Sequence, residues 1–115
     1  MRIIVISDTH QYYRNFETIV LRNPDADMFL HLGDGESEYQ LLCRNMPEVA
    51  DKFRYVKGNC DYCSDAPLTE LIDVAPNHRI LATHGHRYRV NSTLDYLEQE
   101  ALENGCDVAL YGHTH

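Results

Sequence analysis

Side chains able to bind metals or move protons gather in five short clusters along this chain of 115 residues. Each cluster directly follows a short apolar run. The clusters are Asp8-Thr9-His10, Gly33-Asp34, Gly58-Asn59-Cys60-Asp61, His84-Gly85-His86 and Gly112-His113-Thr114-His115. Imidazole combined with carboxylate and amide oxygens suits Zn, Mn, Fe, Ni or Co, whereas Ca or Mg is held mostly by oxygens. Any one of these histidines alone would more often be an ordinary surface residue, but together the clusters predict a transition-metal site.

The apolar runs before the clusters predict the strands that position them, and helical patterns separate these strands. Strands are predicted at residues 2–7, 28–33, 53–58, 68–74, 79–85 and 107–112, with 68–74 and 79–85 as an antiparallel pair. Helices are predicted at 13–22, 36–46 and 91–105. This order is typical of a layered α/β fold in a single domain.

The clusters should converge in space. The carboxyl ends of parallel strands lie along one edge of an α/β sheet, so residues far apart in sequence meet there. Glycines beside the polar residues let the backbone turn sharply and approach a ligand closely. We therefore expect one site at this edge.

Composition narrows the class of partner. The chain has 10 Lys+Arg against 18 Asp+Glu, a formal charge of -8, which opposes non-specific binding to nucleic acid. A small phosphorylated substrate stays open, because a bound metal can reverse the local sign of charge. No apolar run approaches the ~20 residues of a membrane span, and no secretory core follows Met1, so we predict a cytoplasmic protein without membrane contact. The cysteines at 43, 60, 63 and 106 are then expected as reduced thiols.

In this order the five motifs resemble the signature of the calcineurin-like metallophosphoesterases. The small single-domain bacterial and archaeal phosphodiesterases are the most similar branch, since their asparagine motif often reads Gly-Asn-Cys-Asp. The resemblance spans residues 2–115 and implies an α-β-β-α sandwich with a two-metal site. It assigns one ion to Asp8, His10, Asp34 and His115, and the other to Asp34, Asn59, His84 and His113, with Asp34 as the bridge.

The resemblance also implies a reaction. Two divalent ions, of which Mn²⁺ is the expected one and Ni²⁺, Zn²⁺, Fe²⁺ or Co²⁺ are alternatives, would share a hydroxide that attacks a small phosphodiester in line. We expect the catalytic residues to be Asp34, Asn59, His84 and His86. Some members of the superfamily are instead protein-assembly scaffolds. Scaffold members tend to lose metal ligands, whereas all seven matching positions are kept here, which favours the enzyme.

One position departs from the wider superfamily. Many members carry histidine directly after the asparagine, and this chain has Cys60 there. A thiol with an ordinary pKa near 8.5 is a poor general acid at that place. We therefore expect a preference for activated leaving groups, or a proton from His86 or a metal-bound water. His86 has an equally weighted alternative role, which is to support His84 or contact the phosphate.

Three acidic residues and a cysteine pair have less specific interpretations. Cys60 and Cys63 form a Cys-x-x-Cys pair, but the pair overlaps the asparagine motif, so redox chemistry is a minor alternative. Asp61 either orients a ligand or caps its loop, and the cap is slightly preferred. Glu36 and Glu38 are interpreted as the charged start of a helix rather than as ligands.

The chain stops at His115, directly after the last motif. Small members of the resembled family usually continue for several dozen residues, with strands that complete the second sheet. We therefore expect a C-terminally truncated domain over residues 1–115, with strands 68–74 and 79–85 exposing unpaired edges. Such edges predict self-association into a homo-oligomer. We also expect His113 and His115 to be the weakest ligands, because chain ends fray.

Overall fold

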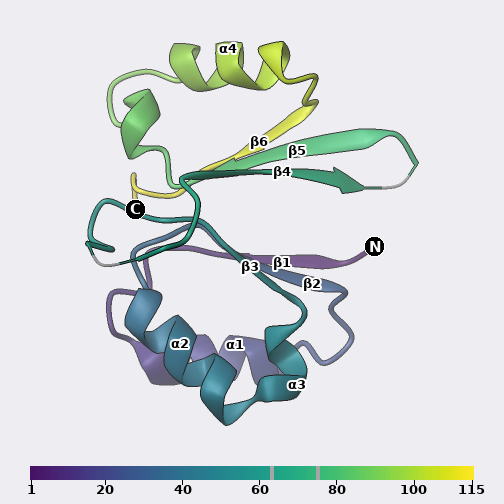
Figure 1. Cartoon of the computed structure of the whole chain (residues 1–115), viewed down its shortest axis with the longest axis vertical. Helices are drawn as coiled ribbons and strands as arrows, with labels where there is room; N and C mark the ends of the chain where they lie inside the picture. Colours follow the sequence, from purple (N-terminus) through teal and green to yellow (C-terminus); the bar gives the residue numbers. More distant parts are fainter. Residues whose placement is uncertain (63, 75) are drawn as a thin grey trace.

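The fold is a sandwich of two β-sheets with helices on both outer faces. The structure, a computed structural model, describes residues 1–62, 64–74 and 76–115. Its two three-stranded sheets lie face to face, with α1, α2 and α3 below the first sheet and α4 above the second in Figure 1. The α-β-β-α layering expected from the resemblance is confirmed.

The first sheet is parallel and has the strand order β1-β2-β3. Helices connect its strands, as parallel pairing requires. Its strands are β1 (Ile3–Ile6), β2 (Met28–His31) and β3 (Phe53–Tyr55), and its helices are α1 (Tyr13–Leu21), α2 (Glu36–Asn45) and α3 (Pro47–Ala50). All three strands therefore end at the same edge of the molecule.

The second sheet is mixed, with the order β4-β5-β6. Its elements are β4 (Thr69–Val74), β5 (His78–Thr83), a short 3₁₀ helix η1 (His86–Tyr88), α4 (Asp95–Glu103) and β6 (Val108–Leu110). The predicted antiparallel pairing of β4 with β5 is confirmed. The predicted free edge on strand 79–85 is wrong, because β5 pairs with β4 on one side and runs parallel to β6 on the other.

Three apolar clusters fill the three spaces between the layers. Side chains of α1, α2 and the first sheet form one, around Phe16, Phe29 and Leu42. The second lies between the sheets, and the third lies under α4 around Leu97. Strand β2 shows why the sequence folds this way: Phe29 faces the helices and Leu30 faces the other sheet, because successive side chains of a strand point to opposite faces.

Several element boundaries differ from the predictions, by up to four residues. Helix α2 ends before Pro47, in agreement with the helix predicted at 36–46, and a further short helix, α3, begins at Pro47, because proline is tolerated in the first turn. Helix α4 begins at Asp95 rather than near residue 91. On α1, Phe16 and Val20 make the buried contact, whereas Ile19 is partly exposed.

Other predictions concern cysteines and membrane spans. Cys43, Cys60 and Cys106 are free thiols, as expected. Cys63 lies outside the described residues, and so does the interpretation of Cys60 and Cys63 as a Cys-x-x-Cys pair. In the described part of the chain, no helix has the length and apolarity that crossing a membrane requires.

Candidate metal centre

The five predicted clusters meet at the edge where the strands of the first sheet end. The loops after β1, β2, β3 and β5 and the chain end after β6 lie together on the left of Figure 1. Six of their seven candidate ligands form two groups of three side chains, and the seventh, Asn59, lies beside His84 in the second group. The groups are Asp8 with His10 and His115, and Asp34 with His84 and His113.

The first group is the more exposed of the two. Nε2 of His115 lies 3.1 Å from Oδ1 of Asp8 and 3.2 Å from Nε2 of His10. Nε2 of His10 lies 3.6 Å from the same carboxylate oxygen. The side chain of His115 is 60% exposed, so the last residue is the least sheltered of these donors.

The second group is buried around His84, whose side chain has no exposed surface. Its Nε2 atom lies 2.9 Å from Oδ1 of Asn59, 3.1 Å from Nδ1 of His113 and 3.3 Å from Oδ2 of Asp34. Four potential donor atoms thus converge on one small volume. Asn59 contributes a neutral oxygen to this set.

The other nitrogen of the His84 ring determines what these atoms can do. Nδ1 lies 2.7 Å from the carbonyl oxygen of Leu32, so it carries the ring proton and donates to that oxygen. In the neutral ring, Nε2 then holds a lone pair that faces the carboxylate of Asp34 and the amide oxygen of Asn59, neither of which has a proton to give. Lone pairs that face one another repel, and a cation among them would remove the repulsion. The donor set therefore fits a metal ion.

Asp34 faces both groups, as does Asp8, whose Oδ1 lies 3.8 Å from Nε2 of His84. Oδ2 of Asp34 lies 3.3 Å from Nε2 of His84 and 4.0 Å from Nε2 of His10. Its Oδ1 accepts the backbone N–H of Cys60 at 2.8 Å, which fixes the carboxylate. This is the position that the resemblance assigned to the bridging ligand.

Five of the seven candidate ligands have a left-handed backbone, which is uncommon outside glycine. The φ angles are 56° for Asp8, 42° for His10, 63° for Asp34, 69° for His113 and 53° for His115. Each such residue costs roughly 1 kcal/mol or more. Strain of this kind clusters where a fold must aim side chains at one point. It is concentrated here at the proposed ligands.

Two glycines allow the loops to come this close. A Cβ on Gly58 would lie 2.1 Å from Oδ1 of Asp34, and one on Gly112 would lie 1.9 Å from Oγ of Ser7 and 2.7 Å from Oδ2 of Asp8. Any larger residue would therefore push two ligand-bearing loops apart. These contacts give a physical reason for glycine in two of the motifs.

Asp61 ties two of the ligand-bearing loops together. Its carboxylate accepts backbone N–H groups from Asp34 at 2.9 Å and Gly58 at 2.8 Å, and the hydroxyl of Tyr55 at 2.8 Å. Burial alone would raise the pKa of Asp61, but these hydrogen bonds outweigh it and lower the pKa. The preferred interpretation of Asp61 as a cap of its own loop is too narrow, because it also holds the Asp34 loop.

A buried chain of hydrogen bonds through His31, Thr9 and Glu38 supports the loop after β1, which carries Asp8 and His10. The backbone N–H of Gly33 donates to Nδ1 of His31 at 3.1 Å, so the ring proton sits on Nε2 and faces the Thr9 hydroxyl at 3.1 Å. Thr9 in turn donates to Glu38 at 2.9 Å. Glu38 does lie in the first turn of α2, as predicted, but it is also buried and holds the residue between Asp8 and His10. Sequence reasoning missed His31, because its role depends on contacts between distant segments.

His86 lies beside the second group and outside it. Its ring centroid is 5.5 Å from that of His84 and 6.2 Å from that of His113, and its buried Nδ1 has no hydrogen-bond partner among the described residues. Burial, reinforced by both neighbouring imidazoles, lowers the pKa of His86. The pKa of the exposed Cys60 thiol is raised, by desolvation first and by Asp34 next, which weakens it further as an acid.

The two packed sheets with outer helices, and the two groups of donors at one edge, place the chain in the class of layered α/β proteins with a candidate two-metal site. The chain belongs to the calcineurin-like phosphoesterase superfamily, whose domain matches residues 1–115. That superfamily implies divalent metal ions, and the two groups of donors are where they would bind.

Individual relatives cover the whole chain. A probable metallophosphoesterase of Bacillus subtilis, YsnB, is 34% identical over 116 residues, which are 100% of this chain and 64% of that protein. A crystal structure of a conserved, predicted phosphoesterase from Streptococcus pneumoniae matches 96% of this chain and 60% of its own, with 29% identity and a TM-score of 0.76. Vps29 from Entamoeba histolytica, as a single mutant, matches 100% of this chain and 65% of its own, with 25% identity and a TM-score of 0.77. The chain thus spans less than two thirds of the length of each of these three proteins.

Proposed function

We propose that this chain carries the metal centre of a metal-dependent phosphoesterase that hydrolyses phosphodiesters. The observation that carries the proposal is the convergence of His84 Nε2, Asn59 Oδ1, Asp34 Oδ2 and His113 Nδ1 on one small volume, where the oxygens of Asn59 and Asp34 have no proton to give. Membership of the superfamily supports the same activity.

The proposal assigns roles to the chain's own residues. Asp8, His10 and His115 would hold one ion, His84, Asn59 and His113 the other, and Asp34 would contribute to both. When bound, two divalent ions activate a water for attack and offset the charge that builds up on the phosphate oxygens. Mn²⁺ is the ion we expect.

Supporting residues keep the donors in place during the reaction. The carbonyl of Leu32 holds the His84 ring in the tautomer that leaves Nε2 free. Asp61 holds the backbone of Asp34. His86 stands beside the centre, where it would contact a phosphate oxygen or supply a proton to the leaving group. Preorganised contacts of this kind are what lowers the barrier in phosphate chemistry.

A chromogenic assay tests the proposal. We expect the Mn²⁺-loaded protein to hydrolyse bis(4-nitrophenyl) phosphate faster than 4-nitrophenyl phosphate, and chelator to abolish both reactions. Asp34→Asn should remove the activity, whereas Asp51→Asn, the same change at an exposed carboxylate next to α3, should leave it intact. Hydrolysis that survives the chelator, or survives Asp34→Asn, would contradict the proposal.

The second candidate function is a scaffold for protein assembly. Vps29 has this fold and is not named as a phosphoesterase, so the fold alone need not imply hydrolysis. This match favours the scaffold as the second candidate. A protein that binds metal but hydrolyses neither ester would support the scaffold.

A further inference from the structure

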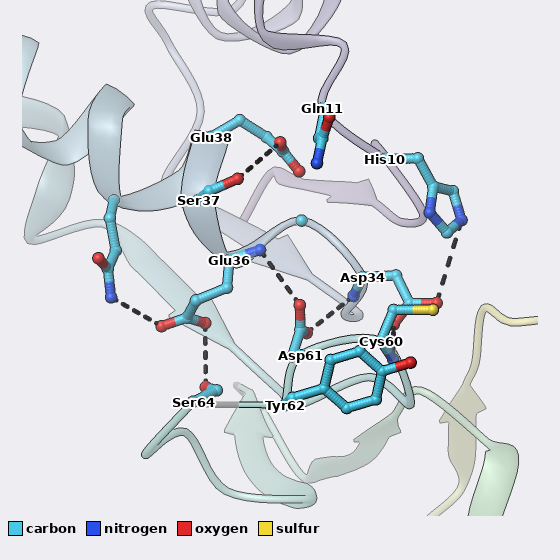
Figure 2. A pocket seen from close by; sticks show the side chains of 12 residues that line it. His10, Gln11, Asp34, Glu36, Ser37, Glu38, Cys60, Asp61, Tyr62 and Ser64 are labelled. Atoms are coloured by element: carbon cyan, nitrogen blue, oxygen red, sulfur yellow. Dashed lines mark hydrogen bonds and ion pairs between the residues drawn. The ribbon is translucent and has the colours of Figure 1, made fainter.

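A cavity of about 420 Å³ opens directly beside the candidate metal centre. It shares His10 and Asp34 with the two groups of donors and extends along the first turn of α2 to Glu36 and Ser64. Figure 2 shows Glu36 well separated from His10, with Asp34, Asp61 and Tyr62 between them. A phosphodiester held at the metal centre would therefore have room here for one of its two ester groups.

The charge of this cavity is one-sided. Glu36, Glu38 and Asp61 line it in addition to Asp34, and no lysine or arginine is among the described residues that do so. None of these three carboxylates forms an ion pair with a described residue. Glu38 is only 4% exposed, and its two oxygens accept hydrogen bonds from the hydroxyls of Thr9 and Ser37, which carry no positive charge. A cation brought into the cavity would therefore be attracted by carboxylates that no positive side chain has neutralised.

Glu36 is the carboxylate best placed to meet such a group. Its two oxygens accept hydrogen bonds from Nε2 of Gln40 and Oγ of Ser64, each at 3.0 Å. Both partners are uncharged, so they fix the carboxylate without neutralising it. Its position is therefore set before a ligand arrives.

Tyr62 adds an aromatic surface to the same cavity. The residue is 83% exposed, and its ring lies beside Cys60 in Figure 2. An aromatic face attracts ammonium groups through its quadrupole, and the attraction adds to that of a nearby carboxylate. A second phosphate on the substrate would meet only repulsion from the carboxylates here.

We infer that this cavity binds one alcohol half of the diester, and that it favours an alcohol bearing an ammonium group over an uncharged one and rejects one bearing a further anion. This inference rests on the proposed hydrolysis and adds the substrate class to it. Glu36 and Tyr62 are the residues that would make the distinction.

The test compares three 4-nitrophenyl phosphodiesters with the Mn²⁺-loaded protein. Their second ester group is choline, its uncharged isostere 3,3-dimethylbutanol, or 3-hydroxypropanoate. We expect kcat/KM to fall in that order, with choline preferred over the isostere roughly fivefold or more. Glu36→Gln should bring this ratio close to one. Glu48→Gln, which removes the same charge from an exposed site on α3, should leave the ratio unchanged.

Binding to the metal-free protein provides a readout that does not depend on hydrolysis. Choline titrated into ¹⁵N-labelled protein should shift the amide signals of Glu36, Tyr62 and Ser64, and Glu36→Gln should remove these shifts. If no ester is hydrolysed but choline shifts these signals, the proposed hydrolysis fails and the cation preference of the cavity stands. Equal hydrolysis of the choline and dimethylbutyl esters, with no choline-dependent shifts, would overturn the inference and leave the proposed hydrolysis intact.

Discussion

Asp8, two residues after the end of β1, accepts a hydrogen bond from the backbone N–H of His113 near the other end of the chain, at 3.0 Å. The two residues are 105 positions apart. Their contact brings the first and last motifs together. The side chain of Asp8 is only 10% exposed, so this hydrogen bond is largely sheltered from water. Hydrogen bonds from Ser7 and His113 outweigh the effect of burial and lower the pKa of Asp8.

Gly112→Ala should disrupt this contact. The added Cβ would collide with Ser7 and with the Asp8 carboxylate, so the segment carrying His113 and His115 would move away. We expect a loss of about 1–3 kcal/mol in the free energy of unfolding and a weaker affinity for Mn²⁺. Denaturant unfolding and a metal titration measure the two effects.

Gly105→Ala is the matched control for that variant. Gly105 has a left-handed backbone with φ of +67°, but a Cβ added there would meet no atom within 4 Å beyond its chain neighbours. It should lose about 1 kcal/mol of stability with no change in metal affinity. An equal metal affinity of Gly112→Ala and the parent would contradict the role given to this contact.

Asp61→Asn should weaken the metal centre without touching a proposed ligand. One oxygen of the carboxylate accepts the bonds from Asp34, Gly58 and Tyr55, and the other accepts the backbone N–H of Glu36 at 3.3 Å. Asparagine lacks the charge that strengthens these bonds, and its NH₂ group would face at least one of the N–H donors. We expect a loss of roughly 2–3 kcal/mol in unfolding free energy, and a metal affinity lower by about 10-fold or more. Tyr55→Phe removes one of these bonds together with the bond that the hydroxyl accepts from the backbone N–H of Gly35 at 2.9 Å, and should cost about 1–3 kcal/mol. If Asp61→Asn lost stability while keeping full metal affinity, Asp61 would be a purely structural residue.

The main outline of the site could be predicted from the sequence, because its residues follow apolar strands directly. Asp8, Asp34 and His84 each come at a strand end, and parallel strands end at one edge. The supporting contacts could not be predicted in this way. The bonds from His31 through Thr9 to Glu38 join a strand, a loop and a helix, and their geometry exists only after the layers have packed. The position of β5 in the middle of its sheet was not predicted for the same reason, because α4 separates β5 in the sequence from β6, its parallel partner.

Buried His31 should make the stability of the metal-free protein depend on pH. Burial, which outweighs the attraction of Asp61 and Asp8, lowers the pKa of His31 from 6.5 to about 4. The folded protein therefore binds fewer protons here than the unfolded chain between these two values. Stability from this residue is fully present above pH 6.5 and is lost as the pH falls toward 4, by on the order of 3 kcal/mol.

Denaturant unfolding of the metal-free protein at several pH values measures this loss. His31→Gln keeps one donor and one acceptor but has no group that titrates in this range. It should therefore show a flatter dependence of stability between pH 4 and 6.5 than the parent. Equal slopes for the two proteins would show that His31 is not buried in its neutral form.

His86→Ala tests which of two roles this residue has. Cys60 is a weak acid directly after Asn59, so a proton for the leaving group would have to come from elsewhere. If His86 supplies it, the rate for His86→Ala should fall more steeply than that of the parent as the leaving-group pKa rises. Rates over a series of substituted aryl esters measure the slope. An unchanged slope with a lower rate overall would assign His86 to phosphate contact instead.

The count of metal ions bound per chain tests the central claim most directly. Equilibrium dialysis against Mn²⁺ followed by elemental analysis, on the parent and on Asp34→Asn, provides it. Because Asp34 faces both groups of donors, we predict about two ions per chain in the parent and about one or fewer in the variant. A parent that binds a single ion or none, or a variant that keeps both, would contradict the two-metal centre.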